Sequence, residues 1–430
     1  MSISVSITCA LLLISAATVQ LVIAALFRKR FISVCREEQS KKQTAEGKPS
    51  SPAVILMSLR GNDPSLRDSL EGALSQEYGG QYQVRVVVDH ATDPAVPLLA
   101  ELQENHANGN RLSYSVMESP AKTCSLKCHS LSQSVSELPA EIEYVALLDA
   151  DVRPHSTWLT ELARPLTNDE TIGGVTGTQW FEPPTGAGVG AWLRSVWNGG
   201  ATILTIHFAN PWAGSFAMRH ADLVASGLIE RWQKSMVDDG PIRAAMKSID
   251  KRICFAPSIV MVNGERCTLR YTLNWAARML TWSRLYEPTF WITILHALFS
   301  NFVMLVNFSV LATGLFGWLP PVTIWISLAA LIVAGTECAV AFCLSRSCVG
   351  ESLKLRSEEL TRLGGRHWLW AFVCAAPAHL MFGWGCMIAL MTKRITWRGI
   401  EYRLGTGGEA ERLNYQPFAS VSNTESDHSI

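Results

Sequence analysis

Two carboxylates separated by one small residue follow an apolar segment of the chain. Asp149 and Asp151 come directly after residues 144–148, which hold four apolar residues in a row. Such a run predicts a buried parallel strand, and ligands of open α/β sheets collect where parallel strands end. Neighbouring carboxylates repel each other unless a cation lies between them, which favours a divalent metal. On the tripeptide alone, a turn capping a helix that begins near Ser156 or Thr157 explains the acids equally well.

Acidic side chains recur at the ends of other predicted elements. Asp89 follows a predicted strand at 84–88, and the pair Asp238 and Asp239 precedes a predicted helix at 242–247. Capping and the helix dipole alone explain acids at a helix start. Three acidic sites in one α/β domain exceed what capping requires, however, so the whole set favours a shared ligand site.

Strands and helices alternate through the segment that carries these acids. Apolar runs at 53–59 and 112–117 predict further strands, and helical spacing lies between the predicted strands. Lys122 and Lys127 stand near the start of the helix that returns to the 144–148 strand. The alternation predicts an α/β domain with a mostly parallel sheet. The chain has no Gly-x-Gly-x-x-Gly or Walker loop, so Rossmann dehydrogenases and phosphate-loop enzymes lose support.

The composition indicates a membrane and not a nucleic acid as the partner. The 430 residues include 37 basic and 37 acidic ones, so no net field attracts a polyanion. Apolar residues make up 48% of the chain and gather in long runs. The first run, 5–27, is followed by the basic residues 28–30, which predicts a signal anchor whose basic flank stays in the cytoplasm. The other runs cover 290–319, 322–344 and 367–391.

Two further stretches suit the membrane surface. Residues 269–286 predict a basic amphipathic helix bearing tryptophans. The Gly- and Trp-rich stretch 186–217 suits either a segment that dips into the headgroups or a plain hydrophobic core. If a cytosolic domain is followed by three single crossings, the basic tail ends outside, against the positive-inside tendency. One run is therefore expected to be re-entrant or split, and the sequence does not say which.

These features predict consecutive segments in which a folded domain stands between membrane anchors. A domain held in this way lies flat on the bilayer, where lipid hydroxyls reach it. The segments are an N-terminal transmembrane anchor (1–30), a polar linker (31–51), an α/β domain (52–268), an interfacial helix (269–287), a C-terminal transmembrane region (288–392) and a tail (393–430).

The motifs resemble those of the inverting glycosyltransferases of family two, and within them ceramide glucosyltransferase and its bacterial relatives in family twenty-one. The shared pattern covers about residues 53–404: an Asp at a strand end, a D-x-D, a later acidic pair and a Gln/Arg-x-x-Arg-Trp helix. Arg278 and Trp282 match that helix. Thr281 stands where its second basic residue belongs, and Arg284 follows three residues on, where it shares the same helix face.

The resemblance implies a fold and a reaction. The fold is a GT-A type nucleotide-sugar-binding domain with transmembrane helices at both ends and the catalytic domain facing the cytoplasm. The reaction moves a hexose, glucose in ceramide glucosyltransferase, from a UDP-sugar to a lipid hydroxyl and gives a β-glycolipid. Mg²⁺ or Mn²⁺ held by Asp149 and Asp151 would neutralise the leaving diphosphate, while Asp89 holds the uracil or ribose. Asp239 would take the acceptor proton, with Asp238 orienting it.

The remaining contacts and the open alternatives complete this interpretation. The ending at 395–403 also resembles the Trp-Arg-Gly-x-x-Tyr ending of lipid-directed members. The alternatives are another lipid such as diacylglycerol or a hopanoid, another sugar, a polysaccharide synthase, or a non-catalytic membrane scaffold. The complete set of acids argues against a non-catalytic scaffold, and Thr281 in place of the motif's second basic residue argues against a polysaccharide synthase. The sequence identifies no protein partner. Further substrate contacts are expected from Lys122, Lys127, Arg278, Trp282, Arg284, Trp397 and Arg398.

Overall fold

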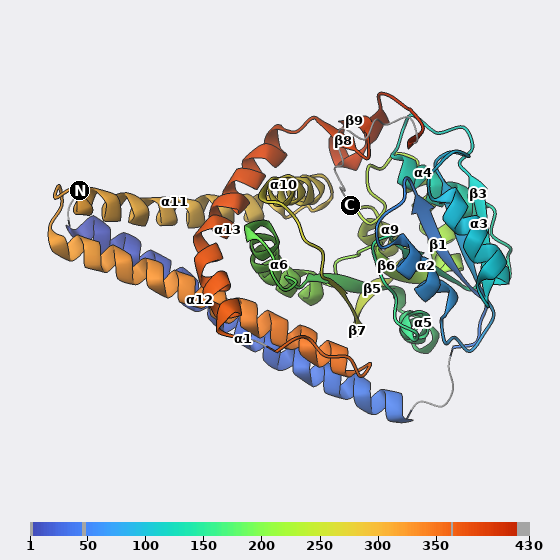
Figure 1. Cartoon of the computed structure of the whole chain (residues 1–430), viewed down its shortest axis with the longest axis horizontal. Coiled ribbons are helices and arrows are strands. Elements are labelled where there is room, and N and C mark those ends of the chain that lie inside the picture. The colour runs from blue at the N-terminus through green and yellow to red at the C-terminus, as the bar shows by residue number, and fades with distance from the viewer. Residues whose placement is uncertain (1–2, 45–48, 363, 419–430) are drawn as a thin grey trace. The chain divides into compact units, whose positions relative to one another are not determined.

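The structure of the chain is a computed structural model that describes residues 3–44, 49–362 and 364–418 (Figure 1). The chain forms two compact units, each assembled from separate stretches. The α/β unit consists of Lys41–Gln179, Phe208–Met261 and Thr392–Ile430. The helical unit consists of Met1–Ser40, Trp180–His207 and Val262–Met391. Residues 52–268, expected as one continuous domain, are therefore divided between the two units.

A seven-stranded sheet forms the centre of the α/β unit. Its strands are β1 (Ala53–Leu59), β2 (Tyr82–Val88), β3 (Leu112–Val116), β4 (Tyr144–Leu148), β5 (Ile172–Phe181), β6 (Ser215–Arg219) and β7 (Arg252–Asn263). Their order across the sheet is β3-β2-β1-β4-β6-β5-β7. The pairs β3-β2, β2-β1 and β1-β4 are parallel, whereas β6 is antiparallel to both β4 and β5. The sheet is mostly parallel, and the predicted α/β fold class is confirmed.

Helices cover both faces of this sheet. Ile55 and Met57 pack on one face with α2, α3 and α5, while Val54 and Leu56 pack on the other with α4, α7, α8 and α9. Because both faces are covered, the central strands are continuous apolar runs. The helices are α2 (Leu66–Leu74), α3 (Val96–Asn105), α4 (Leu126–Ser136), α5 (Trp158–Asn168), α7 (His220–Ala225), α8 (Leu228–Trp232) and α9 (Ile242–Ser248), with a 3₁₀ turn at Gly109–Arg111.

The C-terminal tail folds as part of the α/β unit. It forms an antiparallel sheet of β8 (Arg394–Trp397), β9 (Ile400–Leu404) and β10 (Ala410–Arg412), with a 3₁₀ turn at Thr406–Gly408. The backbone N–H of Ala410 donates to the Lys234 carbonyl (2.9 Å), and that of Arg412 donates to the Lys122 carbonyl (2.7 Å). These bonds attach a tail that the sequence suggested to be separate; its residues 419–430 lie outside the described part.

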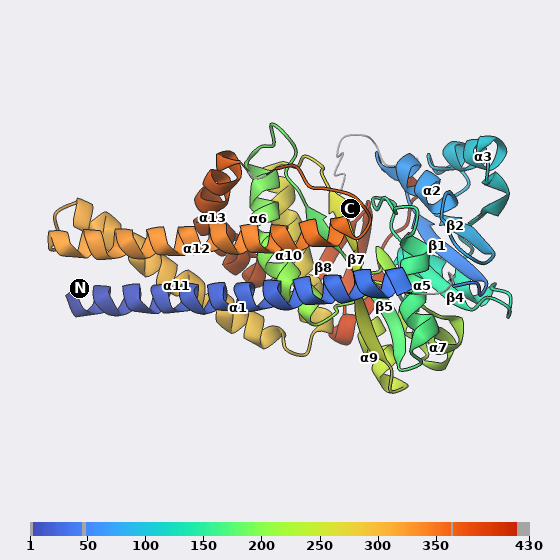
Figure 2. The same cartoon turned by 90° about the horizontal axis from the view of Figure 1, so that it is seen from below.

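The helical unit is built from long helices. They are α1 (Ile3–Thr44), α6 (Val189–His207), α10 (Leu269–Tyr286), α11 (Phe290–Leu315), α12 (Pro321–Lys354) and α13 (Gly365–Met391). Within the described residues, α1, α11, α12 and α13 are long and apolar enough to cross a membrane. In two perpendicular views α1, α11 and α12 run lengthwise beside one another, whereas α13 runs across them (Figures 1 and 2).

The first helix is longer than the sequence analysis anticipated. Residues 31–44, expected to begin a polar linker, continue α1 as helix. They contain no glycine or proline that would end it. The other part of the expected linker includes residues 45–48, which lie outside the described residues.

Candidate active site

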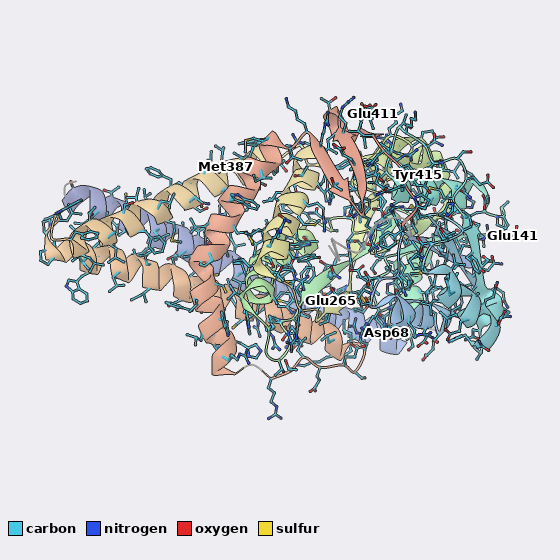
Figure 3. The ribbon with its side chains drawn as sticks, turned by 45° about the horizontal axis from the view of Figure 1, so that its top comes forward. Asp68, Glu141, Glu265, Met387, Glu411 and Tyr415 are labelled. Carbon is cyan, nitrogen blue, oxygen red and sulfur yellow. The ribbon has the colours of Figure 1, made fainter. Side chains whose placement is uncertain are left out.

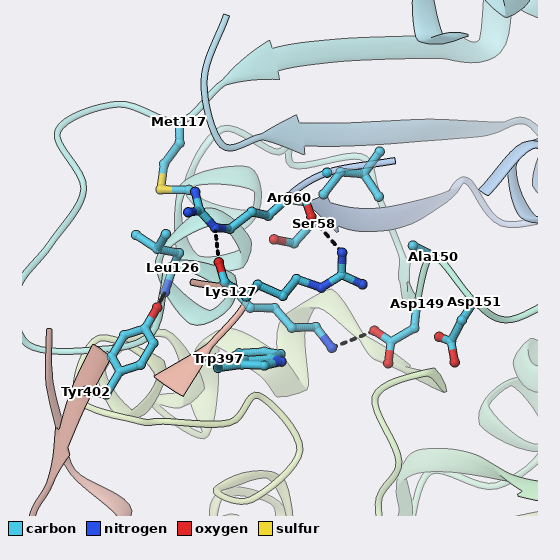
Figure 4. A pocket seen from close by; sticks show the side chains of 13 residues that line it. Ser58, Arg60, Met117, Leu126, Lys127, Asp149, Ala150, Asp151, Trp397 and Tyr402 are labelled. Atoms are coloured by element: carbon cyan, nitrogen blue, oxygen red, sulfur yellow. Dashed lines mark hydrogen bonds and ion pairs between the residues drawn. The ribbon is translucent and has the colours of Figure 1, made fainter. Parts of the chain in front are cut away.

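The two acids of the D-x-D motif stand at the carboxyl end of β4. All five residues of β4 are buried. Asp149 and Asp151 follow it, and both line one pocket (Figure 4). The Ser69 hydroxyl on α2 lies 3.1 Å from the Asp149 carbonyl and 2.5 Å from the Val152 carbonyl, so it fixes the turn that carries both acids. The strand thus presents two carboxylates to a cavity at the sheet edge.

Lys127 on α4 lies between acids from two distant segments. Its Nζ is 2.5 Å from Asp149 Oδ1 (Figure 4). The same Nζ is 2.8 Å from Asp238 Oδ2. Burial by itself would lower the pKa of the Lys127 amino group, but the two carboxylates raise that pKa above its usual range. The group therefore stays protonated, and its charge offsets the repulsion between Asp149 and Asp238.

The acidic pair Asp238 and Asp239 precedes α9. Trp232 Nε1 donates to the Asp238 carbonyl (2.8 Å), and the Ile242 N–H donates to the Asp239 carbonyl (3.1 Å), so the local backbone is fixed. Asp238 is buried and Asp239 is half-buried. Burial, followed by the charge of Asp238, raises the pKa of Asp239 to about 7. A carboxyl with such a pKa is suited to accept a proton near neutral pH. Lys127, which lines the pocket, connects this pair to it.

A tight turn between β8 and β9 carries Trp397 and Arg398 to the same pocket. Trp397 pairs with Ile400, so Arg398 and Gly399 form a two-residue hairpin turn. Their φ angles of 47° and 77° are both positive, as type I′ turns require, and glycine is preferred there. Arg398 Nη1 donates to the Arg60 carbonyl (2.6 Å), which holds the turn at the end of β1. The Trp-Arg-Gly motif is therefore a hairpin turn that lines the pocket.

Asp89 at the end of β2 is buried and is covered by the tail. Its carboxylate forms an ion pair with Arg60, which lines the pocket, whereas Asp89 itself does not. The Tyr415 hydroxyl donates to the Asp89 carbonyl (3.2 Å), and Arg60 Nη2 donates to the Gln416 carbonyl (2.9 Å). Burial raises the pKa of Asp89, and the Arg60 guanidinium opposes that shift. The Arg60 side chain also lies over the Phe418 ring, 5.6 Å from its centre.

The acids of the pocket fit a divalent cation that arrives with a phosphate ligand. Among the described residues, no group of three or more acids, histidines or cysteines is arranged to hold a metal. Mg²⁺ is commonly bound through one or two carboxylates plus substrate phosphates, which Asp149 and Asp151 would allow. Burial, and then the nearby charge of Asp149, raises the pKa of Asp151 to about 7. A bound cation would relieve that repulsion.

A family model accounts for nearly the whole chain. The model of glycosyl transferase family 21 matches residues 9–410. The chain belongs to glycosyl transferase family 21. The resemblance drawn from the acid motifs is confirmed, and this family-21 protein is a glycosyltransferase with an α/β fold and with apolar helices from both ends of the chain.

None of the curated proteins matches the family-21 chain significantly. Among solved structures it is similar to the mannosyltransferase PcManGT from Pyrobaculum calidifontis in complex with GDP-Man and Mn²⁺, with 15% identity, 88% of this chain and 99% of that chain covered, and a TM-score of 0.45. It is also similar to glucosyl-3-phosphoglycerate synthase from Mycobacterium tuberculosis in complex with Mn²⁺ and UDP-glucose, with 15% identity, 58% and 79% covered, and a TM-score of 0.34.

Some expected contacts of the family-21 protein lie outside the pocket lining. Lys122 is exposed and does not line the pocket. Arg278, Trp282 and Arg284 lie on α10, in the helical unit. Thr281, in the place of the motif's second basic residue, is buried, and its hydroxyl donates to a carbonyl of its own helix (2.8 Å).

Two pocket residues had no assigned role in the sequence analysis. Arg60 directly follows β1, just as Asp149 follows β4, so its position at a strand end was an available signal. Tyr402 is the tyrosine of the Trp-Arg-Gly-x-x-Tyr ending, and its hydroxyl accepts from the Leu126 N–H (3.3 Å) at the start of α4. A search of the sequence for charged side chains does not find such a tyrosine, because it acts through a hydrogen bond to the backbone.

Proposed function

We propose that this family-21 protein transfers glucose from UDP-glucose to the hydroxyl of a membrane lipid such as ceramide and forms a β-glycolipid. The observation that carries the proposal is the bridge made by Lys127 between Asp149 and Asp238. It joins the D-x-D motif to the acid pair before α9 in one site. An inverting transfer needs a cation-binding group for the leaving diphosphate and a carboxylate for the acceptor proton. The α/β unit holds candidates for both.

The donor is expected to bind in the pocket below the hairpin turn. Asp149 and Asp151 would hold Mg²⁺ or Mn²⁺, which when bound would neutralise the leaving diphosphate. Lys127 adds a fixed positive charge beside Asp149, placed before the reaction begins. Trp397 offers an aromatic face to a base or sugar ring, and Arg398 offers a guanidinium to phosphate.

The nucleoside contact involves a pair and not a lone acid. Asp89 is buried behind Arg60, and Arg60 lines the pocket. We therefore assign the uracil or ribose contact to the Asp89 and Arg60 pair, with Arg60 nearer to the ligand. Lys122 has no assigned role because it is exposed away from the pocket lining.

The acceptor reacts by a single displacement. The lipid hydroxyl attacks the anomeric carbon on the face opposite the diphosphate, its proton passes to Asp239, and the bond to the diphosphate oxygen breaks. Asp238, held by Lys127, orients Asp239. Inversion converts an α-linked donor into a β-linked product. Arg278, Trp282 and Arg284 on the basic helix α10 are assigned to substrate contacts at the membrane surface.

The membership of the tail in the α/β unit supports a membrane topology. The stretch Val262–Met391 leaves that unit, and Thr392 returns to it, so we infer an even number of membrane crossings between them. Because α11 and α12 run lengthwise beside α1 while α13 runs across them, we assign crossings to α1, α11 and α12 and place α13 in one leaflet (Figures 1 and 2). This removes the parity conflict that three single crossings would create. The basic residues 28–30 support our assignment of the α/β unit to the cytoplasm.

Purified protein in lipid nanodiscs provides the test. UDP release is measured with UDP-glucose, Mg²⁺ or Mn²⁺, and ceramide, diacylglycerol or a hopanoid alcohol as acceptor, and the lipids are then analysed by mass spectrometry. The expected result is acceptor-dependent UDP release with a hexose added to ceramide. Absence of UDP release with every acceptor contradicts the proposal. A hexose on diacylglycerol or a hopanoid alone corrects the acceptor.

A further inference from the structure

Beyond the small sheet of β8, β9 and β10, the chain continues as a short strap over the ends of β1 and β2. The strap is residues 415–418, Tyr-Gln-Pro-Phe, and it lies after residue 410, where the match to the family model ends. The backbone just before it is anchored to β9: the Leu413 N–H donates to the Glu401 carbonyl (2.8 Å), and the Glu401 N–H donates to Asn414 Oδ1 (2.7 Å). A strap anchored at its start can leave its place without disturbing the small sheet.

The strap uses one nitrogen of the Arg60 guanidinium. Nε of Arg60 donates to the Arg398 carbonyl (2.9 Å), and Nη1 forms the ion pair with Asp89. Nη2, the third nitrogen, donates to the Gln416 carbonyl of the strap (2.9 Å). Arg60 lines the pocket beside Asp149 and is the residue assigned above to the nucleoside contact (Figure 4). With the strap in place, every nitrogen of this guanidinium is therefore bonded to protein.

The Phe418 ring packs against two residues that line the pocket. The Arg60 guanidinium carbon lies over the ring, 5.6 Å from its centre. The ring is also so close to Gly61 that a Cβ at that position would lie 2.6 to 2.9 Å from three of the ring carbons. Nucleobases stack on arginine guanidinium planes through the same kind of flat π face. Phe418 thus covers a surface on which a base could stack.

Asp89 is enclosed by the strap and is incompletely hydrogen-bonded. Its side chain is 0% exposed, and the Tyr415 hydroxyl donates to its backbone carbonyl (3.2 Å). Oδ2 of Asp89 pairs with Arg60, whereas Oδ1 meets no donor in hydrogen-bonding geometry within the described residues. A buried acceptor without a partner is costly. An N–H or O–H group of a nucleoside would satisfy Oδ1, so a nucleoside can offer Asp89 a bond that the strap does not.

We propose that residues 415–418 form an autoinhibitory strap that occupies the nucleoside side of the pocket and is displaced when a uridine nucleotide binds. The proposal rests on the proposed function, in which the donor is a UDP-sugar. The strap and the nucleoside compete for the Arg60 guanidinium and for the space around Asp89. The apparent Kd for the nucleotide then equals the intrinsic Kd divided by the fraction of molecules in which the strap is open. Each contact that holds the strap closed therefore weakens nucleotide binding.

Isothermal titration of the full-length protein in nanodiscs with UDP and Mn²⁺ tests the competition. Phe418→Ala should tighten UDP binding about fivefold, the size expected when one cation–π contact of the closed strap is lost. Tyr415→Phe removes the bond to the Asp89 carbonyl and should also tighten UDP binding about fivefold. Phe418→Tyr keeps the ring and should bind UDP like the wild type. A gain in affinity cannot arise from misfolding, which would only remove binding.

Gln416→Ala is the matched control within the strap. The Gln416 side chain is exposed, and its bond to Arg60 is made by the backbone carbonyl, so this variant should bind UDP like the wild type. Hydrogen exchange then reports where the strap lies. Saturating UDP with Mn²⁺ should speed the exchange of the backbone amides in residues 415–418, because the strap leaves its place. Unchanged or slower exchange would make the strap part of the bound site and overturn the proposal.

Kinetics separate the strap from the proposed reaction. Phe418→Ala should lower the KM for UDP-glucose about fivefold and leave the KM for ceramide unchanged. Weaker UDP binding in Phe418→Ala, or unchanged binding in both Phe418→Ala and Tyr415→Phe, overturns the strap. If no lipid is glucosylated but Phe418→Ala still binds UDP more tightly, the strap stands and the proposed function fails. If ceramide is glucosylated and neither variant changes UDP binding, the proposed function stands and the strap fails.

Discussion

The amino group of Lys127 lies 2.5 Å from Asp149 and 2.8 Å from Asp238. One ammonium therefore neutralises two carboxylates that come from segments almost ninety residues apart. In the absence of a donor substrate, this lysine occupies part of the coordination space of Asp149. Its charge also opposes the approach of a free cation. We therefore expect the contacts of Lys127 with the two carboxylates to affect both the rate of the reaction and the order in which metal and nucleotide bind.

Replacing Lys127 with Met should change metal binding as well as turnover. We expect kcat to fall about 100-fold, the usual effect of removing one fixed charge from a site of charge transfer. The affinity for Mn²⁺ without nucleotide should rise, because Asp149 becomes available and a positive charge is gone. Isothermal titration with Mn²⁺ measures this, with Lys122→Met as the control at an exposed lysine of the same segment. Unchanged Mn²⁺ affinity in Lys127→Met would contradict the prediction.

Asp149→Asn and Asp151→Asn should each reduce UDP-glucose turnover by at least about 100-fold, because half of the carboxylate charge on the metal is lost. Metal-dependent UDP binding should weaken in parallel, and EDTA should no longer affect the residual binding. Glu141→Gln, at an exposed acid, serves as the control and should behave like the wild type (Figure 3). Metal-dependent binding that survives in both asparagine variants would exclude these residues as ligands.

The pH dependence should follow Asp239. Its pKa is raised by burial and by Asp238 to about 7, so turnover should fall about tenfold for each pH unit below 7 as the base is protonated. The folded state holds this proton more tightly than the unfolded chain, whose carboxyl has a pKa of about 3.8. Stability from this group is therefore lost as pH rises from about 4 to 7.

A substitution at Asp239 separates these two effects. Asp239→Asn removes the ionisation penalty, so its Tm should exceed that of the wild type at pH 8, and the difference should shrink at pH 5. Thermal unfolding in nanodiscs at both pH values measures the change. A Tm difference that is larger at pH 5 than at pH 8 would show that the sign of the linkage is wrong.

Arg60→Met should be strongly destabilising, because it leaves the buried Asp89 without its cation. The expected loss is about 3 kcal/mol, in the range for breaking a buried pair by removing one partner. Adding Asp89→Asn should restore part of the stability, since no charge is then buried. The control is Arg67→Met, whose partner Glu101 is exposed, so that its loss should change the stability very little. A double variant no more stable than Arg60→Met would contradict this account.

Much of the fold was predictable because its signals are local. The D-x-D location, the strand at 144–148 and the helix over Leu269–Tyr286 follow from apolar periodicity and need no distant contact. The continuation of α1 to Thr44 was not anticipated, because the polar residues from Glu37 onward show no apolar periodicity that would predict a helix. Composition separates exposed from buried residues more reliably than it separates helix from coil.

The parts that the sequence did not show depend on contacts between distant segments. Lys127 was one of two candidate lysines, and only the position of Asp238 beside it distinguishes it from Lys122. Asp89 looked like an open strand-end acid, but its ion pair with Arg60 and the covering tail became evident only in three dimensions. The sheet formed by β8, β9 and β10 is likewise attached to the α/β unit by hydrogen bonds between residues far apart in the sequence, such as Arg412 and Lys122.

The central claim is an inverting transfer to a lipid with Asp239 as the base. It is tested most directly by incubating the wild type and Asp239→Asn with UDP-glucose, divalent metal and ceramide, and by determining the anomeric configuration of the purified product by NMR. The account predicts a β-linked glucolipid from the wild type, and no product from Asp239→Asn although that variant still binds UDP. An α-linked product, or normal turnover in Asp239→Asn, would contradict it.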